Sequence, residues 1–390
     1  MSMKLYQLNP VCNKNAGNLS VDEYSKGGWL NSFSEGLHSY YPSLIIENHY
    51  LHPGIHEKFI LLRDGFTDVI HPCIKGKLHE KDFDIYSRSF LNYIKGIDDG
   101  VIVNHRPFTF MSLYLSGYMR HKPYIIQTHG EGTPAMSHFF DRNIRTFILH
   151  KLSRELLAPV KHYLAGSKFE VDSLSNEMSF TKTLFKGGID FSKYKPFDKE
   201  SEIRKFIVNG KVNLVYVGKF YRSKGVSDLL QTYSKLKEKN SNISLVCIGG
   251  STSDELFDKV NQTADYVFTR ISNSAMIEIL RECDIYILPT QNMGKVYQCG
   301  GIGTSPIEAM ALGIPVISNN LIHFQNLNDI GSVGVIPGDN YFKAILDVMN
   351  DLSSYNNVRA ISQTYYDNKT VFENYLNVAK SVWGRSNVNS

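Results

Sequence analysis

The chain has 390 residues, enough for two or three domains. Hydrophobic residues make up 42% and charged residues 21%, close to the globular average, which excludes disorder, collagen and coiled coil as descriptions of the whole. With 42 basic and 38 acidic residues the formal charge is only +4, which excludes a dedicated nucleic-acid binder but would not repel phosphate-bearing small molecules or an anionic membrane surface.

The first half of the chain mixes strand-like and helix-like segments. Short apolar runs predict strands at Lys4–Leu8, Ser43–Glu47, Val101–Val103, Tyr124–Thr128 and Tyr163–Ala165, and helical spacing predicts helices at Trp29–Leu37 and Thr109–Tyr118. Not every element can be placed between Leu51 and Lys95, where several prolines and glycines interrupt the pattern.

The second half alternates more regularly. Strands rich in Val and Ile are predicted at Val212–Val217, Ile243–Ile248, Tyr266–Thr269, Ile285–Leu288 and Pro315–Ile317. Helices are predicted between them at Val226–Lys237, Asp254–Gln262, Ala275–Glu282 and Pro306–Leu312. This alternation predicts a doubly wound parallel sheet.

A polar segment at 195–202 containing Pro196 is typical of a linker. We therefore expect an N-terminal Rossmann-like domain over 1–195, a C-terminal Rossmann-like domain over 196–365, and a helical segment over 366–390 that packs back on the N-terminal domain. In such α/β sheets ligands bind at the carboxyl ends of the strands. Two domains facing across a cleft would each hold one substrate.

The strongest local signal is a glycine-rich loop, a short helix and a strand over 300–317. Ser305 is predicted as the N-cap and Pro306 as the first helical residue. Backbone N–H groups of Gly303, Thr304 and Ser305 would point at an anion, which the helix dipole also favours. A diphosphate is the natural occupant.

Glu308 follows Ser305 at the spacing of a capping box. Two interpretations stand: the carboxylate returns to its own helix start, or it accepts hydrogen bonds from two hydroxyls, such as a ribose diol. The two roles require different rotamers.

A basic turn follows the predicted strand Val212–Val217 and precedes a helix. It carries Lys219, Arg222 and Lys224. Like charges gathered at such a turn indicate an anion site. A solvated basic turn is the alternative, above all for Arg222. The G-x-x-x-x-G-K-[ST] spacing of a P-loop is not present.

Four segments in order resemble the retaining, nucleotide-sugar-dependent glycosyltransferases of family 4 (glycosyl transferases group 1), which have the GT-B fold of two Rossmann-like domains. They are Gly218-Lys219 with Lys224-Gly225, Cys283–Thr290, Glu308–Val316 and Gly187–Pro196. In the N-terminal half the resemblance is confined to Gly27-Gly28, Thr128-His129-Gly130 and Gly166-Ser167.

The resemblance implies roles for the matched positions. Lys219 and Lys224 would neutralise the donor diphosphate, and Glu308 would hold the ribose. His129 would lie near the transferred sugar, and Arg270-Ile271 would meet the base. The implied catalytic residues are His129, Lys219, Lys224 and Glu308; the implied donor-binding residues are Gly28, Lys219, Arg222, Lys224, Arg270, Ile271, Gly303, Thr304, Ser305 and Glu308. The family generally works without a bound metal, so neither a metal nor a cofactor is expected.

One departure from the family stands out. The family usually carries a Glu eight residues before Glu308, where this chain has Gly300. Glu131 is a candidate to compensate. The change also motivates a different hypothesis, a catalytically silent GT-B binding or scaffold subunit. A sugar-nucleotide epimerase or phosphorylase is the third, and the matched motifs disfavour it.

The expected function is transfer of a sugar, with retention, from a nucleotide-diphosphate donor (UDP-sugar favoured) to a saccharide or lipid-linked saccharide in surface-glycan biosynthesis: lipopolysaccharide, O-antigen or capsule. Asp82-Phe83-Asp84 matches the metal motif of another glycosyltransferase fold and is interpreted as a coincidence.

Location is expected to be cytoplasmic. Five cysteines without a C-x-x-C pair fit a reducing compartment, and neither a signal peptide nor a spanning segment is predicted. An amphipathic stretch over 140–152 has two interpretations: a helix lying on the inner face of the cytoplasmic membrane, or one packing its apolar stripe on the N-terminal core.

Overall fold

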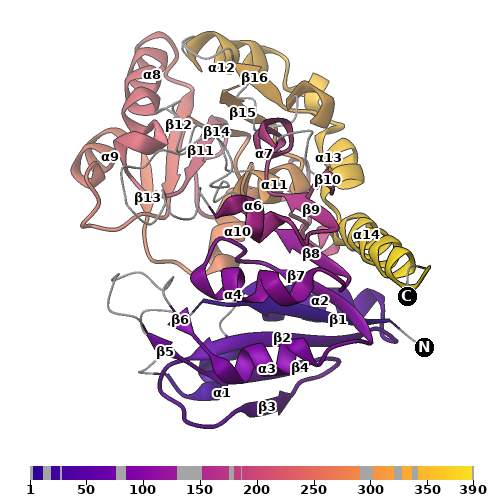
Figure 1. Ribbon diagram of the computed structural model, residues 1–390. Coiled ribbons are helices and arrows are strands. Elements are labelled where there is room, and N and C mark those ends of the chain that lie inside the picture. The colour runs from indigo at the N-terminus through magenta and orange to yellow at the C-terminus, as the bar shows by residue number, and fades with distance from the viewer. Residues whose placement is uncertain are drawn as a thin grey trace. The chain divides into compact units, whose positions relative to one another are not determined.

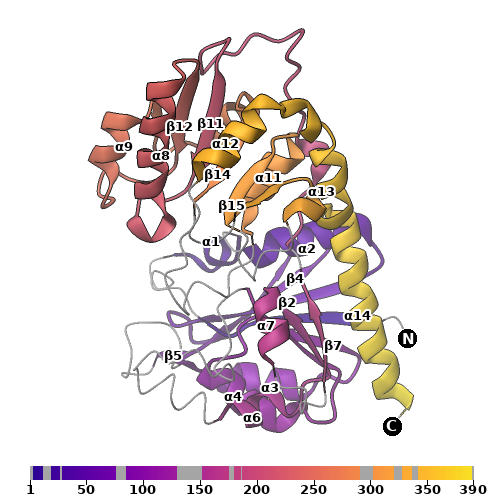
Figure 2. The ribbon, with the colours of Figure 1, turned by 90° about the horizontal axis from the view of Figure 1, so that it is seen from above.

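The computed structural model divides the chain into two compact units (Figures 1 and 2). The N-terminal unit comprises Met1–Phe185 and Phe372–Ser390, and the C-terminal unit comprises Lys186–Val371. The structure describes residues 3–11, 19–26, 29–75, 85–129, 152–174, 180–185, 187–289, 302–319, 327–335 and 341–388. Gly28, Asp82–Asp84, Glu131, Gly300 and most of the 140–152 stretch lie outside these ranges.

The N-terminal unit is built on an eight-stranded sheet with the order β10-β9-β8-β7-β1-β2-β4-β3. Its strands are β1 (Lys4–Asn9), β2 (Ile45–His52), β3 (Phe59–Leu62), β4 (Thr67–Pro72), β7 (Gly100–Asn104), β8 (Tyr124–Gln127), β9 (His162–Ala165) and β10 (Thr181–Leu184). All neighbours pair in parallel except β3 with β4. The short strands β5 (Ile74–Lys75) and β6 (Ile85–Tyr86) pair separately.

Helices cover both faces of this sheet. Alternate strand residues pack against α3 (Arg88–Lys95) and α4 (Phe110–Met119) on one face. On the other face they pack against α2 (Trp29–Tyr40) and α14 (Asn368–Val388). Shorter helices are α1 (Val21–Lys26), α6 (Ser153–Leu157) and α7 (Lys168–Ser173). Because consecutive strand residues point to opposite faces, strands buried on both sides consist of continuous apolar runs.

The C-terminal unit has a six-stranded, fully parallel sheet with the order β13-β12-β11-β14-β15-β16. Its strands are β11 (Val212–Val217), β12 (Ile243–Ile248), β13 (Tyr266–Phe268), β14 (Ile285–Leu288), β15 (Val316–Asn319) and β16 (Val333–Val335). The predicted doubly wound sheet is therefore confirmed.

Two helical layers enclose that sheet. One layer is α8 (Val226–Lys239), α9 (Phe257–Thr263) and α12 (Tyr341–Asn350). The other is α10 (Asn273–Arg281), α11 (Thr304–Ala311) and α13 (Val358–Tyr366). Single 3₁₀ turns lie at Phe191–Lys193, Arg222–Lys224, Leu327–Ile330 and Leu352–Tyr355.

A buried carboxylate, Asp284, binds the polar segment that precedes β11 through Lys199 and Arg204. Asp284 accepts two hydrogen bonds from Arg204 Nη2, both 2.8 Å, and one from Lys199 Nζ at 2.8 Å. It also accepts from the backbone N–H of Asn213 at 2.9 Å. Asp284 precedes β14, at the amino end of the sheet, so the aspartate of the Cys283–Thr290 motif serves the fold.

Candidate donor site

The carboxyl ends of β11 and β14 and the first turn of α11 meet at one place in the C-terminal unit. Tyr286, fully buried on β14, donates to the carbonyl of Val217 at 3.4 Å and hydrogen-bonds the Ser305 hydroxyl at 2.9 Å. A Cβ on Gly225 would lie 1.5 Å from the Pro289 carbonyl oxygen, so the start of α8 abuts the end of β14. The basic turn and the α11 N-terminus therefore share one sheet edge.

Helix α11 begins two residues earlier than the sequence predicts. Gly303, with φ +83°, is the N-cap, and Thr304 is the first helical residue. The predictions of Ser305 as N-cap and Pro306 as first helical residue are wrong, because the left-handed backbone that glycine allows turns the chain before Thr304. Gly303 and Thr304 are exposed, so the amino end of this helix is presented to solvent.

The Glu308 carboxylate is hydrogen-bonded by a tyrosine and not by the start of its own helix. It is 5% exposed, and its Oε1 accepts a 3.0 Å hydrogen bond from the Tyr194 hydroxyl. The capping-box interpretation is wrong, because Ser305 lies inside the helix and cannot act as its cap. Burial raises the pKa of Glu308, and the Tyr194 hydrogen bond opposes that rise.

Tyr194 is a functional candidate that the sequence interpretation passed over, although it lies in the matched Gly187–Pro196 segment. Two hydrogen bonds hold that segment in the C-terminal unit. The backbone N–H of Ile189 donates to the Tyr366 carbonyl at 2.9 Å, and Arg359 Nη2 donates to the Phe191 carbonyl at 2.9 Å. The motif thus carries the tyrosine that orients Glu308.

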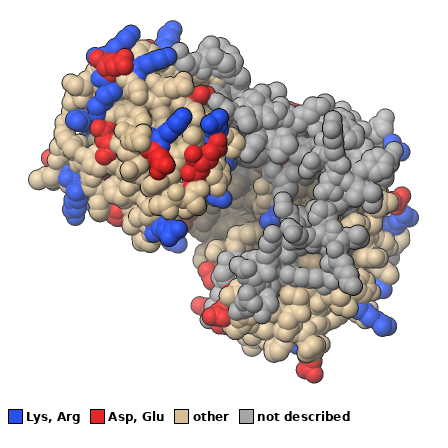
Figure 3. Space-filling model, turned by 90° about the vertical axis from the view of Figure 1, so that its left-hand side faces the viewer, with Lys and Arg blue, Asp and Glu red and all other residues tan. Residues whose placement is uncertain are grey.

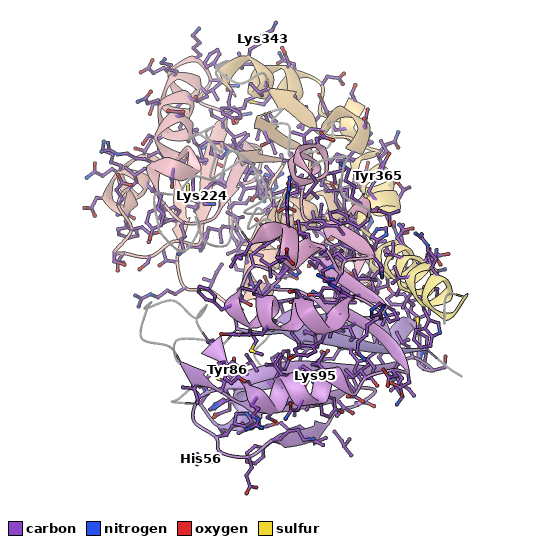
Figure 4. The ribbon with its side chains drawn as sticks, in the orientation of Figure 1. His56, Tyr86, Lys95, Lys224, Lys343 and Tyr365 are labelled. Atoms are coloured by element: carbon purple, nitrogen blue, oxygen red, sulfur yellow. The ribbon has the colours of Figure 1, made fainter. Side chains whose placement is uncertain are left out.

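The three cations of the basic turn have different surroundings. Arg222 forms a 2.8 Å ion pair with Glu255, with both side chains about half exposed or more. Glu255 therefore offsets the charge of Arg222. Lys219 is exposed, and its carbonyl accepts from the Tyr216 hydroxyl at 2.7 Å. Lys224 is partly buried at the end of the 3₁₀ turn leading into α8 (Figure 4).

The ends of β12 and β13 complete the same edge. Arg270, after β13, is the only described non-glycine residue with positive φ, at 54°, and is exposed, while Ile271 packs on the core. Gly249 and Gly250, after β12, have φ of 100° and 64°. A Cβ on Gly249 would lie 3.0 Å from the Gly218 carbonyl oxygen. The sequence interpretation did not include this glycine pair, although two glycines directly after a predicted strand indicate a tight turn.

His129 belongs to the N-terminal unit, just after β8. Its Nε2 lies 3.4 Å from Nδ1 of His105, and its ring centre lies 4.3 Å from that of Trp29. The packed surroundings, and then the Arg106 charge, lower the pKa of His129 to about 4. His105 follows β7 much as His129 follows β8, but no local pattern distinguishes it from other histidines of the chain.

Within the described ranges, no three His, Cys, Asp or Glu side chains are grouped as a metal site would need. The same ranges contain no helix long and apolar enough to span a membrane. On the face of the C-terminal unit seen in Figure 3, basic and acidic side chains are interspersed.

Residues 198–361 match the model of the family described as Glycosyl transferases group 1. An uncharacterized glycosyltransferase of Methanocaldococcus jannaschii is 24% identical over 318 residues, covering 78% of this chain and 74% of the relative. The capsular polysaccharide biosynthesis glycosyltransferase CapM of Staphylococcus aureus is 24% identical over 209 residues. That match covers 51% of each chain, so the chain spans about half the length of this relative.

Solved structures share the fold. Sucrose-phosphate synthase from Thermosynechococcus elongatus superposes with a TM-score of 0.67 at 14% identity, covering 98% of this chain and 100% of that one. Anabaena HepE in complex with UDP gives a TM-score of 0.64 at 12% identity, covering 98% and 100%. The predicted GT-B fold is confirmed. Residues 198–361 are thus similar to the glycosyl transferases group 1 family, and the chain that contains them has the GT-B fold.

Proposed function

We propose that this protein transfers a sugar from a nucleotide-diphosphate donor to a saccharide or lipid-linked saccharide acceptor. One observation carries the proposal: the Lys219–Lys224 turn, the exposed N-terminus of α11 and the Tyr194–Glu308 pair all belong to the carboxyl edge of one parallel sheet. Cations and N–H dipoles suit a diphosphate, and a buried carboxylate suits a ribose diol.

The chemistry needs charge stabilisation at the leaving group. Departure of a nucleoside diphosphate places negative charge on the leaving oxygen and oxocarbenium character on the sugar. Lys219, Lys224 and the first-turn N–H groups of α11 would stabilise that charge from fixed positions. Preorganised donors of this kind typically contribute about 10²–10³ each in rate.

The finer proposal is a UDP-sugar donor, transfer with retention and without a metal, and a product in a surface glycan. Anabaena HepE, which shares the fold, binds UDP, and this supports uracil as the base of the donor. The names of two relatives support the glycan: capsular polysaccharide biosynthesis for CapM, and putative teichuronic acid biosynthesis for TuaC of Bacillus subtilis. We keep the cytoplasm as the location, since Cys73, Cys247 and Cys283 are buried free thiols. Contact with the membrane's inner face stays a prediction.

The test is a thermal-shift panel of UDP-, GDP-, ADP-, CMP- and dTDP-sugars on the wild type, Glu308→Ala and the control Glu278→Ala. Glu278 is exposed on α10 of the same unit. A ligand at a hundredfold excess over Kd stabilises the native state by about 2.7 kcal/mol. A shift for one nucleotide class, kept in Glu278→Ala and lost in Glu308→Ala, is the expected result. A shift retained in Glu308→Ala would remove that residue from the site.

Gly300 in place of the family's usual Glu favours one alternative, a silent binding subunit. Both hypotheses predict donor binding. They separate on turnover: release of nucleoside diphosphate that depends on an acceptor supports the transferase, and tight binding without turnover across an acceptor panel supports the silent subunit.

A further inference from the structure

The N-terminal sheet has an exposed apolar strand at one edge. Strand β3, with the sequence Phe-Ile-Leu-Leu, lies beyond β4 at the end of the strand order (Figure 1). Phe59, Ile60 and Leu62 are 42%, 55% and 82% exposed. Among the described residues β3 pairs with β4 alone, so the backbone on its other side faces no strand of that part of the chain. Such an edge is a template for pairing with another chain.

The opposite edge of the same sheet has a different composition. Strand β10 has the sequence Thr-Lys-Thr-Leu, and its Thr183 hydroxyl hydrogen-bonds His162 of β9 at 2.9 Å. Lysine and other polar side chains are the usual protection of an edge strand against pairing. In β3 only Leu61 packs on a buried cluster of its unit. The packing of one chain therefore does not explain the apolar character of the other three residues.

The pairing with β4 determines which backbone groups of β3 face outward. The Arg63 N–H, just after β3, donates to the Phe66 carbonyl at 2.9 Å, and β3 and β4 are antiparallel. In an antiparallel pair every second residue exchanges hydrogen bonds with its neighbour. Leu61, two residues before Arg63, therefore directs its N–H and C=O to β4. Ile60 and Leu62 direct theirs to the open edge.

A second copy of β3 fits this edge. Two identical strands related by a twofold axis perpendicular to the sheet are antiparallel, and each contact then occurs twice. With Leu61 on the axis, Ile60 lies opposite Leu62 of the second copy, and the outward backbone groups of one strand meet those of the other. The same register sets Lys58 opposite Asp64 of the second copy. Both side chains are exposed, so opposite charges can meet at both ends of the paired strands.

Other registers fit less well. An axis between two residues would set outward backbone groups against groups that already bond β4. An axis at Ile60 keeps the backbone bonds but sets Glu57 opposite Arg63. The Arg63 side chain is only 14% exposed and already forms ion pairs with Asp22 at 2.6 Å and Asp68 at 2.9 Å. The charges therefore favour the axis at Leu61.

We propose that two copies of this chain pair along β3, antiparallel and with Leu61 at the twofold axis, so that their N-terminal sheets form one continuous sheet. Pairing covers Ile60 and Leu62 of both copies, gives their outward N–H and C=O groups partners, and forms the Lys58–Asp64 ion pair twice. The interface contains no residue of the candidate donor site, so the proposal is independent of the proposed function.

Sedimentation equilibrium of the full chain over a concentration series tests the pairing. We expect a wild-type dimer, and in Leu62→Lys a dimer Kd about tenfold or more higher, because a charge replaces an apolar side chain in two cross-strand pairs. Ile203→Lys is the matched control, since Ile203 is 76% exposed in the C-terminal unit, and it should keep the wild-type Kd. A wild-type monomer at every concentration up to about 100 μM, or an equal Kd in Leu62→Lys, would overturn the proposal.

Charge exchange tests the register. Lys58→Asp and Asp64→Lys each set like charges opposite one another at both ends, so each alone should raise the dimer Kd several-fold. The double variant restores opposite charges and should return the Kd close to the wild-type value. A double variant that pairs no better than the single variants would contradict the register and the proposal with it.

Hydrogen exchange of the wild type gives a decision without any variant. The amides of Ile60 and Leu62 face the open edge and gain their hydrogen-bond partners only in the dimer. Fragments covering residues 58–64 should therefore exchange more slowly at high protein concentration than after dilution. Equal exchange at both concentrations would overturn the proposal even if Leu62→Lys failed to fold.

Discussion

The hydrogen bond between Tyr194 and Glu308 gives the sharpest quantitative prediction. Both residues are buried, at 7% and 5% exposure, and the phenol donates to the carboxylate at 3.0 Å. Tyr194→Phe removes one oxygen and leaves the ring packing intact. A hydrogen bond to a charged group contributes about 1.5–3 kcal/mol. We expect Tyr194→Phe to lower the free energy of unfolding by that amount at pH 8.

The pH dependence follows from the direction of the Glu308 pKa. Burial raises it above the ordinary 4.5, so between pH 4.5 and the native pKa the folded state holds a proton that the unfolded state has released. The wild type therefore loses stability from this group as the pH rises through that window. Glu308→Gln removes the effect, so its stability relative to wild type should increase with pH.

The measurement is urea denaturation of wild type, Tyr194→Phe, Glu308→Gln and the double variant at several pH values. Tyr355→Phe is the matched control, because its hydroxyl makes no hydrogen bond among the described residues of the same unit. The prediction is refuted if the free energy of unfolding of Tyr194→Phe at pH 8 lies within about 0.5 kcal/mol of the wild-type value, as it does for ordinary surface substitutions. A coupling energy near zero in the double-mutant cycle would refute it equally.

Four further predictions follow from the C-terminal unit. Lys224→Ala should slow transfer by about 10²–10³, whereas Lys343→Ala, at an exposed position on α12, should match wild type in the same assay. Arg204→Met, which leaves Asp284 with fewer partners, should cost about 3 kcal/mol in urea denaturation, and a loss below 1 kcal/mol would contradict the buried pair. Gly225 has φ +74°, and a Cβ there would lie 1.5 Å from a carbonyl oxygen. Gly225→Ala should therefore lower the stability by more than the about 1–2 kcal/mol that left-handed strain alone costs, which a fall in Tm would show. Transfer assayed in EDTA should match the untreated rate, and a loss restored by Mg²⁺ or Mn²⁺ would show a metal requirement.

The sequence predicted the C-terminal sheet well, because its strands are apolar on both faces. Val212–Val217, Ile243–Ile248 and Ile285–Leu288 were each predicted with the observed bounds. It predicted the stretch between Leu51 and Lys95 poorly. There β4 buries Asp68 and His71 at 0% exposure within six residues, and polar residues in a strand interior break the apolar pattern. Their hydrogen bonds come from distant residues, which no local pattern reveals.

The sequence by itself determined the α/β class, the family resemblance and the residue types of the donor site, because strand periodicity, glycine-rich turns and clustered lysines are local properties of the chain. Only the tertiary structure decided the pairings: Glu308 with Tyr194 across 114 positions, Arg222 with Glu255, and Asp68 with Arg63 and Asn48. A side chain's protonation and orientation depend on the groups around it in space. In a parallel sheet those groups arrive from neighbouring strands that are far apart in the chain.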